Sequence, residues 1–381
     1  MRLVKAYDAI IVGAGPAGSV TAYRLATAGA SVLLLDRAKF PRDKPCGGGL
    51  TYRAMRELPF SVEPVVEDVV DRFEFGFRYG HRFQRRGASP IILMTQRRRL
   101  DAFLAERAVA AGVDFRDGAK VSAVGDDGSV TADGRTFRAG VVIGADGVNG
   151  VTSRSLGLEN RYRYGVALEG NVPYEHAREG RYRGCAVLEL GVVPGGYGWV
   201  FAKGDHVNVG VGGWESEGPQ LRDHLRRLCD AHGISEEAVE SVRGYRLPLR
   251  RPQDTLVRGR VLLVGDAAGL VDPLSGDGMY EAFVSARLAT EATLDVLQER
   301  TSELASYAEA LTAALGSHAA ASWAAKRALD RFPRLVYAFA RLPPVWRFAD
   351  ALLRGELRSP SDARGTAKAP LKVVKALGAA R

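Results

Sequence analysis

The chain has 381 residues, of which 46% are hydrophobic and 25% are charged. This composition excludes a disordered or fibrous chain and provides enough apolar residues for two packed modules. The formal net charge is +9, and arginine contributes 44 of the 53 basic residues; such a surplus fits nucleic acid, anionic lipid or a phosphorylated substrate without selecting among them.

The three cysteines, Cys46, Cys185 and Cys229, are odd in number and far apart. That usage fits a reducing compartment better than a disulfide framework, and no zinc-type pairing is present, so no metal is expected. The sequence has no run of about 18 apolar residues and no export signal. We expect a cytoplasmic protein, with peripheral contact at the inner face of the membrane left open.

The first 36 residues have the pattern of a βαβ unit. An apolar strand at residues 9–12 leads into a glycine turn, a helix and a second apolar strand. In the turn GAGPAG, Gly13 permits the tight bend, Gly15 lets the backbone approach a pyrophosphate, and Gly18 lets the helix pack on the strand. The start of the helix offers N–H groups and a positive dipole end to the phosphates.

An acid closes the second strand of this unit. Asp36 suits the diol of a ribose and, since it is not basic, argues against a 2′-phosphate. We count its neighbour Arg37, and Ala17 at the start of the helix, among the cofactor-binding candidates. Glycines that merely form turns are the alternative, but the strand, helix and acid around them favour a dinucleotide site. FAD and NAD both remain open from this segment alone.

Two later strands also end in an acid among small residues. The strand at residues 141–143 is followed by Asp146, and the strand at 261–264 is followed by Asp266 and a helix that starts near residues 276–279. A nicotinamide dehydrogenase needs neither acid. This order of GxGxxG, Asp-Gly and late Gly-Asp resembles the flavoprotein monooxygenase-like superfamily, which implies FAD.

The resemblance also implies roles for individual residues. Asp266 would hold the ribityl chain of FAD, and the helix start, with candidates Gly276, Gly278 and Met279, would face the isoalloxazine ring, where its dipole would stabilise the reduced anion. In RRRLDAFL, Arg97 stands where the superfamily has an arginine that reaches FAD. The alternatives are that Asp146 is a plain turn residue and that Arg97 is a surface charge.

The stretch DKPCGGGL places Cys46 directly before glycines 47–49. Glycines let the backbone pass close to something flat and wide, so we expect Gly47 to bind the flavin and Cys46 to lie at the edge of its ring. Further along, GYGWVF places Tyr197, Trp199 and Phe201 on one face of a strand. Core packing is the alternative for those aromatic side chains.

Together, PCGGG and GYGWVF resemble the geranylgeranyl reductase family, over residues 1 to about 300. The resemblance implies an FAD-dependent reductase that saturates isolated double bonds of isoprenoid chains on a lipid, a quinone or a prenyl diphosphate. An unactivated alkene accepts a hydride only if a proton arrives at the other carbon, and aromatic faces stabilise the cationic character that develops. The catalytic candidates are therefore Tyr197 and Trp199, with Cys46 as proton donor or polarizable contact.

The motif order predicts an α/β fold in which a discontinuous Rossmann-like FAD-binding domain alternates with a second, mixed or antiparallel β-sheet domain for the substrate, followed by C-terminal helices. We expect the FAD-binding domain at residues 1–70, 95–160 and 252–300, the substrate domain at 71–94 and 161–251, and the helical segment at 301–381.

The helical segment contains an apolar stripe at helical spacing, with arginines between its members: Phe332, Leu335, Val336, Phe339 and Leu342. Such a stretch is typical of a helix in a bilayer interface, and equally of an ordinary packed helix. The sequence therefore leaves membrane contact open.

Two other functions stay open from the sequence. An aromatic hydroxylase could use the same fold with oxygen, and a prenyl-binding chaperone could share the fold without flavin catalysis, although it would not need a complete FAD cradle. No nucleic-acid module is recognisable. The chain has no second GxGxxG, so NADPH would dock transiently, and a ferredoxin-type carrier could equally deliver the electrons.

Overall fold

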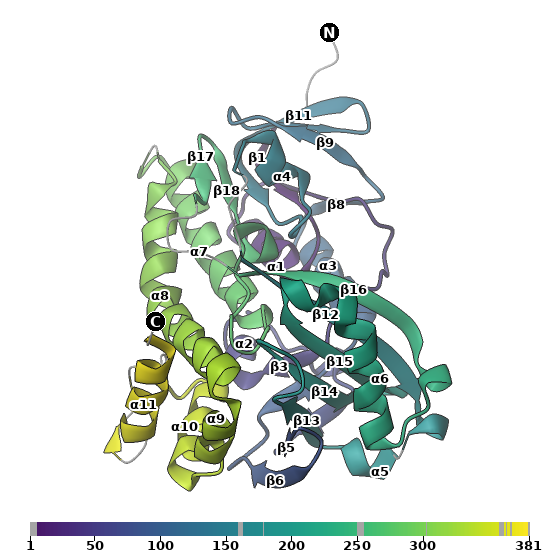
Figure 1. The fold of residues 1–381 in the computed structure, drawn as a ribbon. Coiled ribbons are helices and arrows are strands. Elements are labelled where there is room, and N and C mark those ends of the chain that lie inside the picture. Colours follow the sequence, from purple (N-terminus) through teal and green to yellow (C-terminus); the bar gives the residue numbers. More distant parts are fainter. Residues whose placement is uncertain are drawn as a thin grey trace.

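The computed structural model describes residues 6–158, 163–177, 179–249, 255–301, 303–357, 362, 364–365 and 368–379. Figure 1 shows one large sheet with its helices at the N-terminal end of the molecule, a second large sheet at the opposite end, and helices of the C-terminal part along one side. The expected α/β fold with two sheets and C-terminal helices is confirmed.

The first sheet has eight strands in the order β17-β18-β11-β1-β2-β8, with β10 and β9 continuing from β11. Strands β2, β1, β11 and β18 run parallel, and they are apolar and buried because helices cover them. The strands are β1 (Ala6–Val12), β2 (Val32–Asp36), β8 (Asp114–Asp117), β9 (Val121–Val124), β10 (Ser129–Ala132), β11 (Arg135–Gly144), β17 (Val257–Arg258) and β18 (Val261–Leu263).

Three long helices pack with this sheet: α1 (Pro16–Thr27), α3 (Arg97–Ala110) and α7 (Met279–Leu297). Helix α1 lies against both α3 and α7. The helices α2 (Tyr52–Met55), α4 (Val151–Ser155) and α5 (Glu179–Tyr182) are short. The N-terminal ends of α1 and α7 follow β1 and β18, so both helix starts lie near the carboxyl ends of parallel strands, where α/β proteins bind ligands.

The second sheet has seven strands in the order β16-β12-β15-β14-β13-β5-β6. Only β13 and β5 pair in parallel, so the sheet is mixed and mainly antiparallel, as expected. The strands are β5 (Arg72–Phe77), β6 (His81–Arg86), β12 (Arg163–Pro173), β13 (Cys185–Leu190), β14 (Tyr197–Ala202), β15 (His206–Trp214) and β16 (Glu240–Leu249).

The two faces of the second sheet differ in composition. One face carries Val200, Val209 and Val211, which form an apolar core with Leu225 and Leu228 of α6 (Leu221–His232). Because side chains alternate along a strand, the aromatic residues of β14 lie on the opposite face. That opposite face is therefore available for something other than α6.

A small sheet formed by β3 (Gly49–Thr51), β7 (Ile92–Met94) and β4 (Asp68–Val70) includes the end of the glycine run. Gly49 pairs with Met94 across β3 and β7, and the backbone oxygen of Gly48 accepts a hydrogen bond from the Thr95 N–H at 2.8 Å. The glycine run is thus held as the edge of a sheet and is not a free loop.

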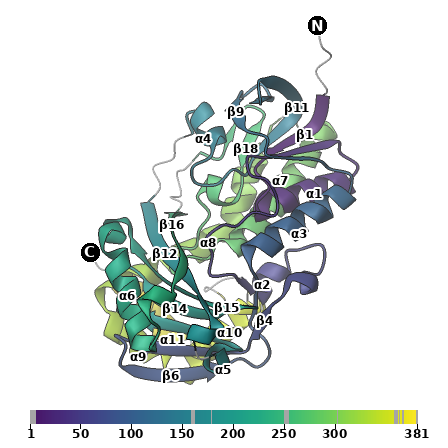
Figure 2. The same cartoon turned by 90° about the vertical axis from the view of Figure 1, so that its right-hand side faces the viewer.

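The C-terminal segment is helical, with α8 (Ala305–Arg331), α9 (Pro333–Ala340), α10 (Pro343–Leu353) and α11 (Lys368–Ala379). In both views α9 and α10 lie beside the β6 end of the second sheet (Figures 1 and 2). Tyr337 of α9 and Trp346 of α10 bond backbone oxygens of β6, at 2.8 and 2.9 Å.

The apolar stripe of this segment is only partly exposed, because Phe332, Val336 and Phe339 are half-buried. Leu335 is 38% exposed and Leu342, which lies between α9 and α10, is 40% exposed, whereas Tyr337 and Trp346 are buried. Among the described helices, none has the length and apolarity that crossing a bilayer requires. The domain boundaries expected at 160/161 and 251/252 fall outside the described residues, and the division into domains stays a prediction.

Candidate cofactor and substrate site

The turn after β1 requires glycine at two positions. Gly13 has φ +104°, and a Cβ there would lie 2.4 Å from the Ala145 carbonyl oxygen. A Cβ at Gly18 would lie 1.9 Å from the Gly13 carbonyl oxygen. Helix α1 starts after Gly15, and no side chain among the described residues caps it. Its first N–H groups are therefore available to an anion.

Asp36 lies at the carboxyl end of β2, directly beside this turn. Its carboxylate accepts hydrogen bonds from the N–H groups of Ala14 and Ala38, both at 2.8 Å. Arg42 approaches it to 3.7 Å. Arg37, which follows Asp36 and was also predicted to bind the cofactor, is exposed.

Arg97 begins α3 and is 5% exposed, so the surface-charge interpretation is wrong. Its guanidinium binds both oxygens of Asp101, at 2.7 and 2.8 Å, and Arg42 binds the same carboxylate at 2.9 Å. Burial lowers the pKa of Arg97, but Asp101 raises it above the usual value. A Cβ on Gly15 would lie 3.7 Å from Arg42, so this charged group borders the glycine turn.

Asp266 lies in η5 (Gly265–Ala268), directly after β18. Its Oδ2 accepts hydrogen bonds from Lys44 Nζ at 2.9 Å and from the Tyr245 hydroxyl at 3.2 Å. Burial raises the pKa of Asp266, but Lys44 and then Arg97 lower it below the usual value. The second sheet, through Tyr245, therefore reaches the carboxylate that the sequence assigned to the cofactor.

The start of α7 adjoins this carboxylate. A Cβ on Gly278 would lie 3.4 Å from Asp266 Oδ1, and Gly276 has φ +68°. The N–H of Met279 donates to Asp277 Oδ1 at 2.9 Å, and burial raises the pKa of Asp277. Asp277 therefore uses part of the hydrogen-bonding capacity of this helix start, unlike the start of α1.

Cys46 is half-buried and its peptide groups are held from the second sheet. The Cys46 N–H donates to Glu169 Oε1 at 2.7 Å, and the Cys46 carbonyl oxygen accepts from Lys203 Nζ at 3.0 Å. The sulfur accepts a weak hydrogen bond from the Gly48 N–H at 3.4 Å. Gly48 has φ +85°, and a Cβ there would lie 2.2 Å from the Thr95 carbonyl oxygen.

The aromatic row of β14 runs between two segments that the sequence assigned to the flavin. A Cβ on Gly47 would lie 3.1 Å from the Phe201 ring, and at the other end the Tyr197 hydroxyl donates to the Ser275 carbonyl oxygen, just before Gly276. The ring centroids of Trp199 lie 6.1 Å from those of Tyr197 and 6.4 Å from those of Phe201. The row therefore spans from the glycine run to the loop before α7.

The core interpretation holds for only part of this row. Trp199 is 8% exposed, and its N–H donates to Asn208 Oδ1 at 2.8 Å. Tyr197 and Phe201 are half-buried. Burial raises the pKa of the Tyr197 hydroxyl, and Asp277 adds to that effect, so the hydroxyl stays protonated at physiological pH.

The backbone of Asp146 borders the glycine turn, since a Cβ on Gly13 would lie 2.8 Å from the Asp146 Cα, but its side chain bonds the helix that follows. Its Oδ2 accepts the N–H and hydroxyl hydrogen bonds of Thr152, at 2.9 and 3.0 Å, in the first turn of α4. A Cβ on Gly150 would overlap the same carboxylate. The structure thus favours the turn-residue alternative for Asp146.

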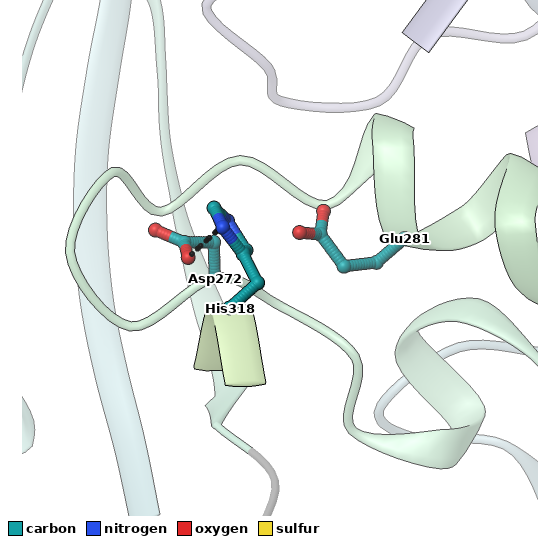
Figure 3. A group of neighbouring side chains, drawn as sticks. All are labelled: Asp272, Glu281 and His318. Carbon is teal, nitrogen blue, oxygen red and sulfur yellow. Dashed lines mark ion pairs between the residues drawn. The ribbon is translucent and has the colours of Figure 1, made fainter. Parts of the chain in front are cut away.

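Figure 3 shows a further buried cluster behind the start of α7. Ligand-type atoms of Asp272, Glu281 and His318 lie within 4.8 Å of one another, and His318 Nε2 lies 3.3 Å from Asp272 Oδ2. Arg53 lies 3.4 Å from the same ring nitrogen and supplies a positive charge. Burial raises the pKa of Glu281 well above its usual value, because desolvation penalises the charged form. We interpret this cluster as a structural link between α2, α7 and α8.

Comparison with known proteins identifies the family. Residues 6–176 match the model of an FAD binding domain. The chain is 33% identical to the geranylgeranyl diphosphate reductase of Rhodobacter capsulatus over 309 residues, which cover 77% of this chain and 76% of that relative. It is 32% identical to the menaquinone reductase of Mycobacterium tuberculosis over 316 residues, which cover 74% of this chain and 76% of the relative.

This chain belongs to the geranylgeranyl reductase family. It is a flavin-dependent oxidoreductase, and its cofactor is FAD. The crystal structure of a geranylgeranyl bacteriochlorophyll reductase-like protein from Thermoplasma acidophilum has the same fold, with a TM-score of 0.83 over 98% of this chain and 99% of that one, at 21% identity. A flavin-dependent brominase also shares the fold, with a TM-score of 0.78 over 97% of this chain, at 18% identity.

The chemistry of the donors in this reductase fits FAD. One uncapped helix start lies beside the glycine turn, an acid lies beside the same turn, and a second acid lies at the end of β18 next to the start of α7. A dinucleotide with two phosphates, a ribose and a ribityl chain needs this set of partners.

Sequence reasoning missed six residues of this reductase site: Arg42, Lys44, Asp101, Glu169, Lys203 and Tyr245. Four had a usable signal. Arg42 and Lys44 lie in the segment PRDKPC that leads into the glycine run, and Asp101 lies in RRRLDAFL. Glu169 also had one, as an acid in the middle of a strand pattern. Lys203 and Tyr245 reach the site only through the pairing of the second sheet, which the sequence does not specify.

Proposed function

We propose that this reductase saturates isolated carbon–carbon double bonds in a prenyl chain carried by a lipid, a quinone or a diphosphate. The observation that carries the proposal is the aromatic row of Tyr197, Trp199 and Phe201, which reaches from Gly47 to Ser275. Relatives named geranylgeranyl diphosphate reductase, digeranylgeranylglycerophospholipid reductase and menaquinone reductase support a prenyl substrate.

In this proposal the residues around the glycine turn bind the pyrophosphate of FAD. Backbone groups at Gly13, Gly15, Ala17 and Gly18 approach the phosphates, and the open N–H groups of α1 bond them. The residues proposed for the rest of the cofactor are Asp36 and Arg37 at the adenosine ribose, Arg97 beside the turn, Asp266 at the ribityl chain, and Gly47, Gly276, Gly278 and Met279 at the ring.

Reduced FAD supplies the hydride in this reaction. The chain itself positions the alkene against the aromatic row and excludes water, so that Tyr197 and Trp199 stabilise the developing positive charge by about 1–2 kcal/mol. Cys46 lies at the ring edge in this proposal. Its half-buried thiol and its backbone contacts with the second sheet support a role in shaping that edge.

We also propose that α9 contacts the inner surface of the membrane, from which the enzyme takes its apolar substrate. Leu335 and Leu342 are exposed, and Arg334 and Arg341 are exposed beside them, so the surface combines apolar and basic side chains. In sedimentation with vesicles containing anionic lipid, we expect the protein to co-sediment and Leu335→Glu/Leu342→Glu to remain in the supernatant. Equal recovery of both proteins in the supernatant would remove the proposal of membrane contact.

The central experiment uses purified holoenzyme, reduced with dithionite without oxygen and mixed with a geranylgeranyl diphosphate, a menaquinone or a digeranylgeranyl lipid. We expect one class of compound to gain two hydrogens per reduced bond by mass spectrometry, as the flavin returns to its yellow form. A hydroxylase would instead add an oxygen atom when air is admitted. Unchanged masses for all prenyl compounds would refute the proposed function. Replacing dithionite by NADPH or by a reduced ferredoxin then identifies the electron donor.

A further inference from the structure

Glu169 lies in the same row of the second sheet as Trp199. In the strand pairing, Glu169 of β12 is opposite Gly210 of β15, and Gly210 is opposite Trp199 of β14. Residues directly opposite one another in paired strands point to the same face. The carboxyl group therefore shares the aromatic face of the sheet and is separated from Trp199 by a residue without a side chain.

The indole ring of Trp199 occupies the space beside Gly210 that a side chain would otherwise take. A Cβ on Gly210 would lie 2.1 Å from Cζ2 of Trp199, so the ring extends over β15 toward β12. Glu169 is the next side chain in that direction. The aromatic row and the carboxyl group consequently form one continuous surface.

The same carboxyl group contacts the glycine run. Glu169 Oε1 accepts the N–H of Cys46 at 2.7 Å, and Cys46 immediately precedes Gly47, which packs against Phe201. Glu169 is only partly buried, so water can reach it. It thus lies where the glycine run meets the aromatic face, the two surfaces between which the proposed function places the ring and the alkene.

The charges around Glu169 come from three segments. Lys203, after β14, binds the Cys46 carbonyl oxygen, and Asp43 before the glycine run pairs with Arg243 of β16 at 2.9 Å. Burial raises the pKa of Glu169 above the ordinary value, although Lys203 opposes this effect. A carboxyl group in such surroundings holds a proton closer to neutral pH than an exposed glutamate does.

We propose that Glu169 is the acid that protonates the alkene carbon opposite the one that receives the hydride, an inference that rests on the proposed function. The hydride of reduced FAD forms one new C–H bond. The π electrons of the alkene form the second C–H bond with the carboxyl proton, whose O–H bond breaks. The alkene is reduced, the flavin is oxidised, and Glu169 is left as a carboxylate that water reprotonates.

Cys46 is the competing donor. A thiol is a weaker acid than a carboxyl group and gives up its proton to a carbon less readily. The Cys46 sulfur also accepts the Gly48 N–H. The experiment must also distinguish proton donation by Glu169 from a purely structural role, because Glu169 accepts a hydrogen bond from the Cys46 backbone.

Glu169→Gln separates these roles, because the amide keeps an oxygen that accepts the Cys46 N–H but has no acidic proton. The experiment compares wild type, Glu169→Gln and Glu169→Asp as holoenzymes. Each is reduced without oxygen and mixed with the prenyl compound that the wild type hydrogenates, and flavin reoxidation is followed in a single turnover. Glu175→Gln, an exposed acid on the segment after β12, is the matched control.

We expect Glu169→Gln to retain FAD and dithionite reduction but to reoxidise with the alkene at least ~100-fold more slowly, with an intermediate rate for Glu169→Asp. The wild-type rate should fall as pH rises and Glu169 ionises, whereas the residual rate of Glu169→Gln should not follow that titration. Infrared spectra of the protein with and without FAD should show a protonated carboxyl band, at pH values where exposed glutamates are ionised, that is missing in Glu169→Gln and shifted in Glu169→Asp.

Three results would overturn the inference. They are a Glu169→Gln rate equal to that of wild type, a slower rate accounted for by lost FAD occupancy, and an infrared band unchanged by the substitution. If wild type hydrogenates its substrate and Glu169→Gln does so equally well, only the role of Glu169 fails. If wild type leaves every prenyl compound unchanged, the proposed function and this inference fail together.

Discussion

The two glycine-rich segments of this reductase, residues 13–18 and 47–49, need glycine for different reasons. At Gly13 and Gly18 an added Cβ would meet backbone of the same βαβ unit or of the adjacent strand end. At Gly47 and Gly48 it would meet Phe201, Thr95 and Lys203, which are distant in the chain. The first segment is enclosed by the βαβ unit and the end of β11 in the first sheet, whereas the second is a contact between the small sheet and the second large sheet.

In the proposed function, the first segment serves the binding of FAD and the second serves the reaction with the alkene. The glycine turn after β1 is enclosed by the first sheet and α1, so we expect it to bind phosphates without help from the second sheet. The glycine run is complete only when Glu169 and Lys203 hold the Cys46 peptide from the second sheet. We therefore expect substitutions in the first segment to abolish cofactor binding, and substitutions around the second to alter turnover more than binding.

The largest effect is expected for Gly18→Ala. The new Cβ would lie 1.9 Å from the Gly13 carbonyl oxygen, and both are backbone positions that cannot move apart without opening the turn. We expect the free energy of unfolding to fall by about 3 kcal/mol and the protein to purify without FAD. Chemical denaturation and the flavin-to-protein absorbance ratio test this. A yellow variant of wild-type stability would contradict the local role of the turn.

Gly48→Ala should have a smaller effect, and Gly29→Ala is its matched control. Both glycines have a positive φ, +85° and +91°, but only Gly48 faces a neighbour, the Thr95 carbonyl oxygen at 2.2 Å. The control should lose about 1 kcal/mol from backbone strain, and Gly48→Ala about 2–3 kcal/mol, because the chain must also shift. We expect Gly48→Ala to retain FAD with weaker affinity. Equal stabilities for the two variants would show that the Thr95 contact is unimportant.

Trp199→Leu tests the aromatic face itself. Removal of an aromatic face that stabilises positive charge by about 1.4 kcal/mol should slow the alkene-dependent reoxidation roughly tenfold while FAD remains bound. Trp214→Leu is the control, since that indole bonds Asp330 and stacks on Trp323, outside the row. A rate loss of the same size in both variants would indicate general destabilisation and not a role of the row.

The smallest effect is expected for Lys44→Met, which removes the cation that links the glycine run to Asp266. Burial raises the pKa of Asp266, but Lys44 and Arg97 lower it below the ordinary value. A lowered carboxyl pKa stabilises the fold above the unfolded pKa, and this contribution is lost as pH falls through the folded pKa. Lys44→Met should therefore be slightly less stable near neutral pH and should begin acid unfolding at a higher pH.

The control for that measurement is Lys39→Met, because Lys39 pairs with Asp117 at the surface and its side chain is 78% exposed. Its acid-unfolding curve should nearly match that of wild type. Thermal unfolding between pH 3 and 7 compares the three proteins. Identical curves for wild type and Lys44→Met would mean that the Lys44–Asp266 pair does not contribute to stability.

The sequence by itself determined the parts of this protein that neighbours along the chain produce. The strand, glycine turn and acid of residues 9–36 predict the dinucleotide turn, and the steric need for Gly18 arises within that unit, from the Gly13 carbonyl oxygen. The steric need for Gly13 comes from Ala145, which the pairing of β1 with β11 brings near. Alternation along β14 likewise predicts that Tyr197, Trp199 and Phe201 share one face.

Only the tertiary structure decided what that face meets. Glu169 and Tyr245 come from separate strands of the second sheet and Lys203 follows a third, so their contacts with Cys46 and Asp266 depend on strand order and register. The physical reason is that pairing between distant strands is selected by the packing of whole faces, which no local pattern encodes. The glycine turn could therefore be located from sequence, whereas the residue proposed to deliver the proton could not.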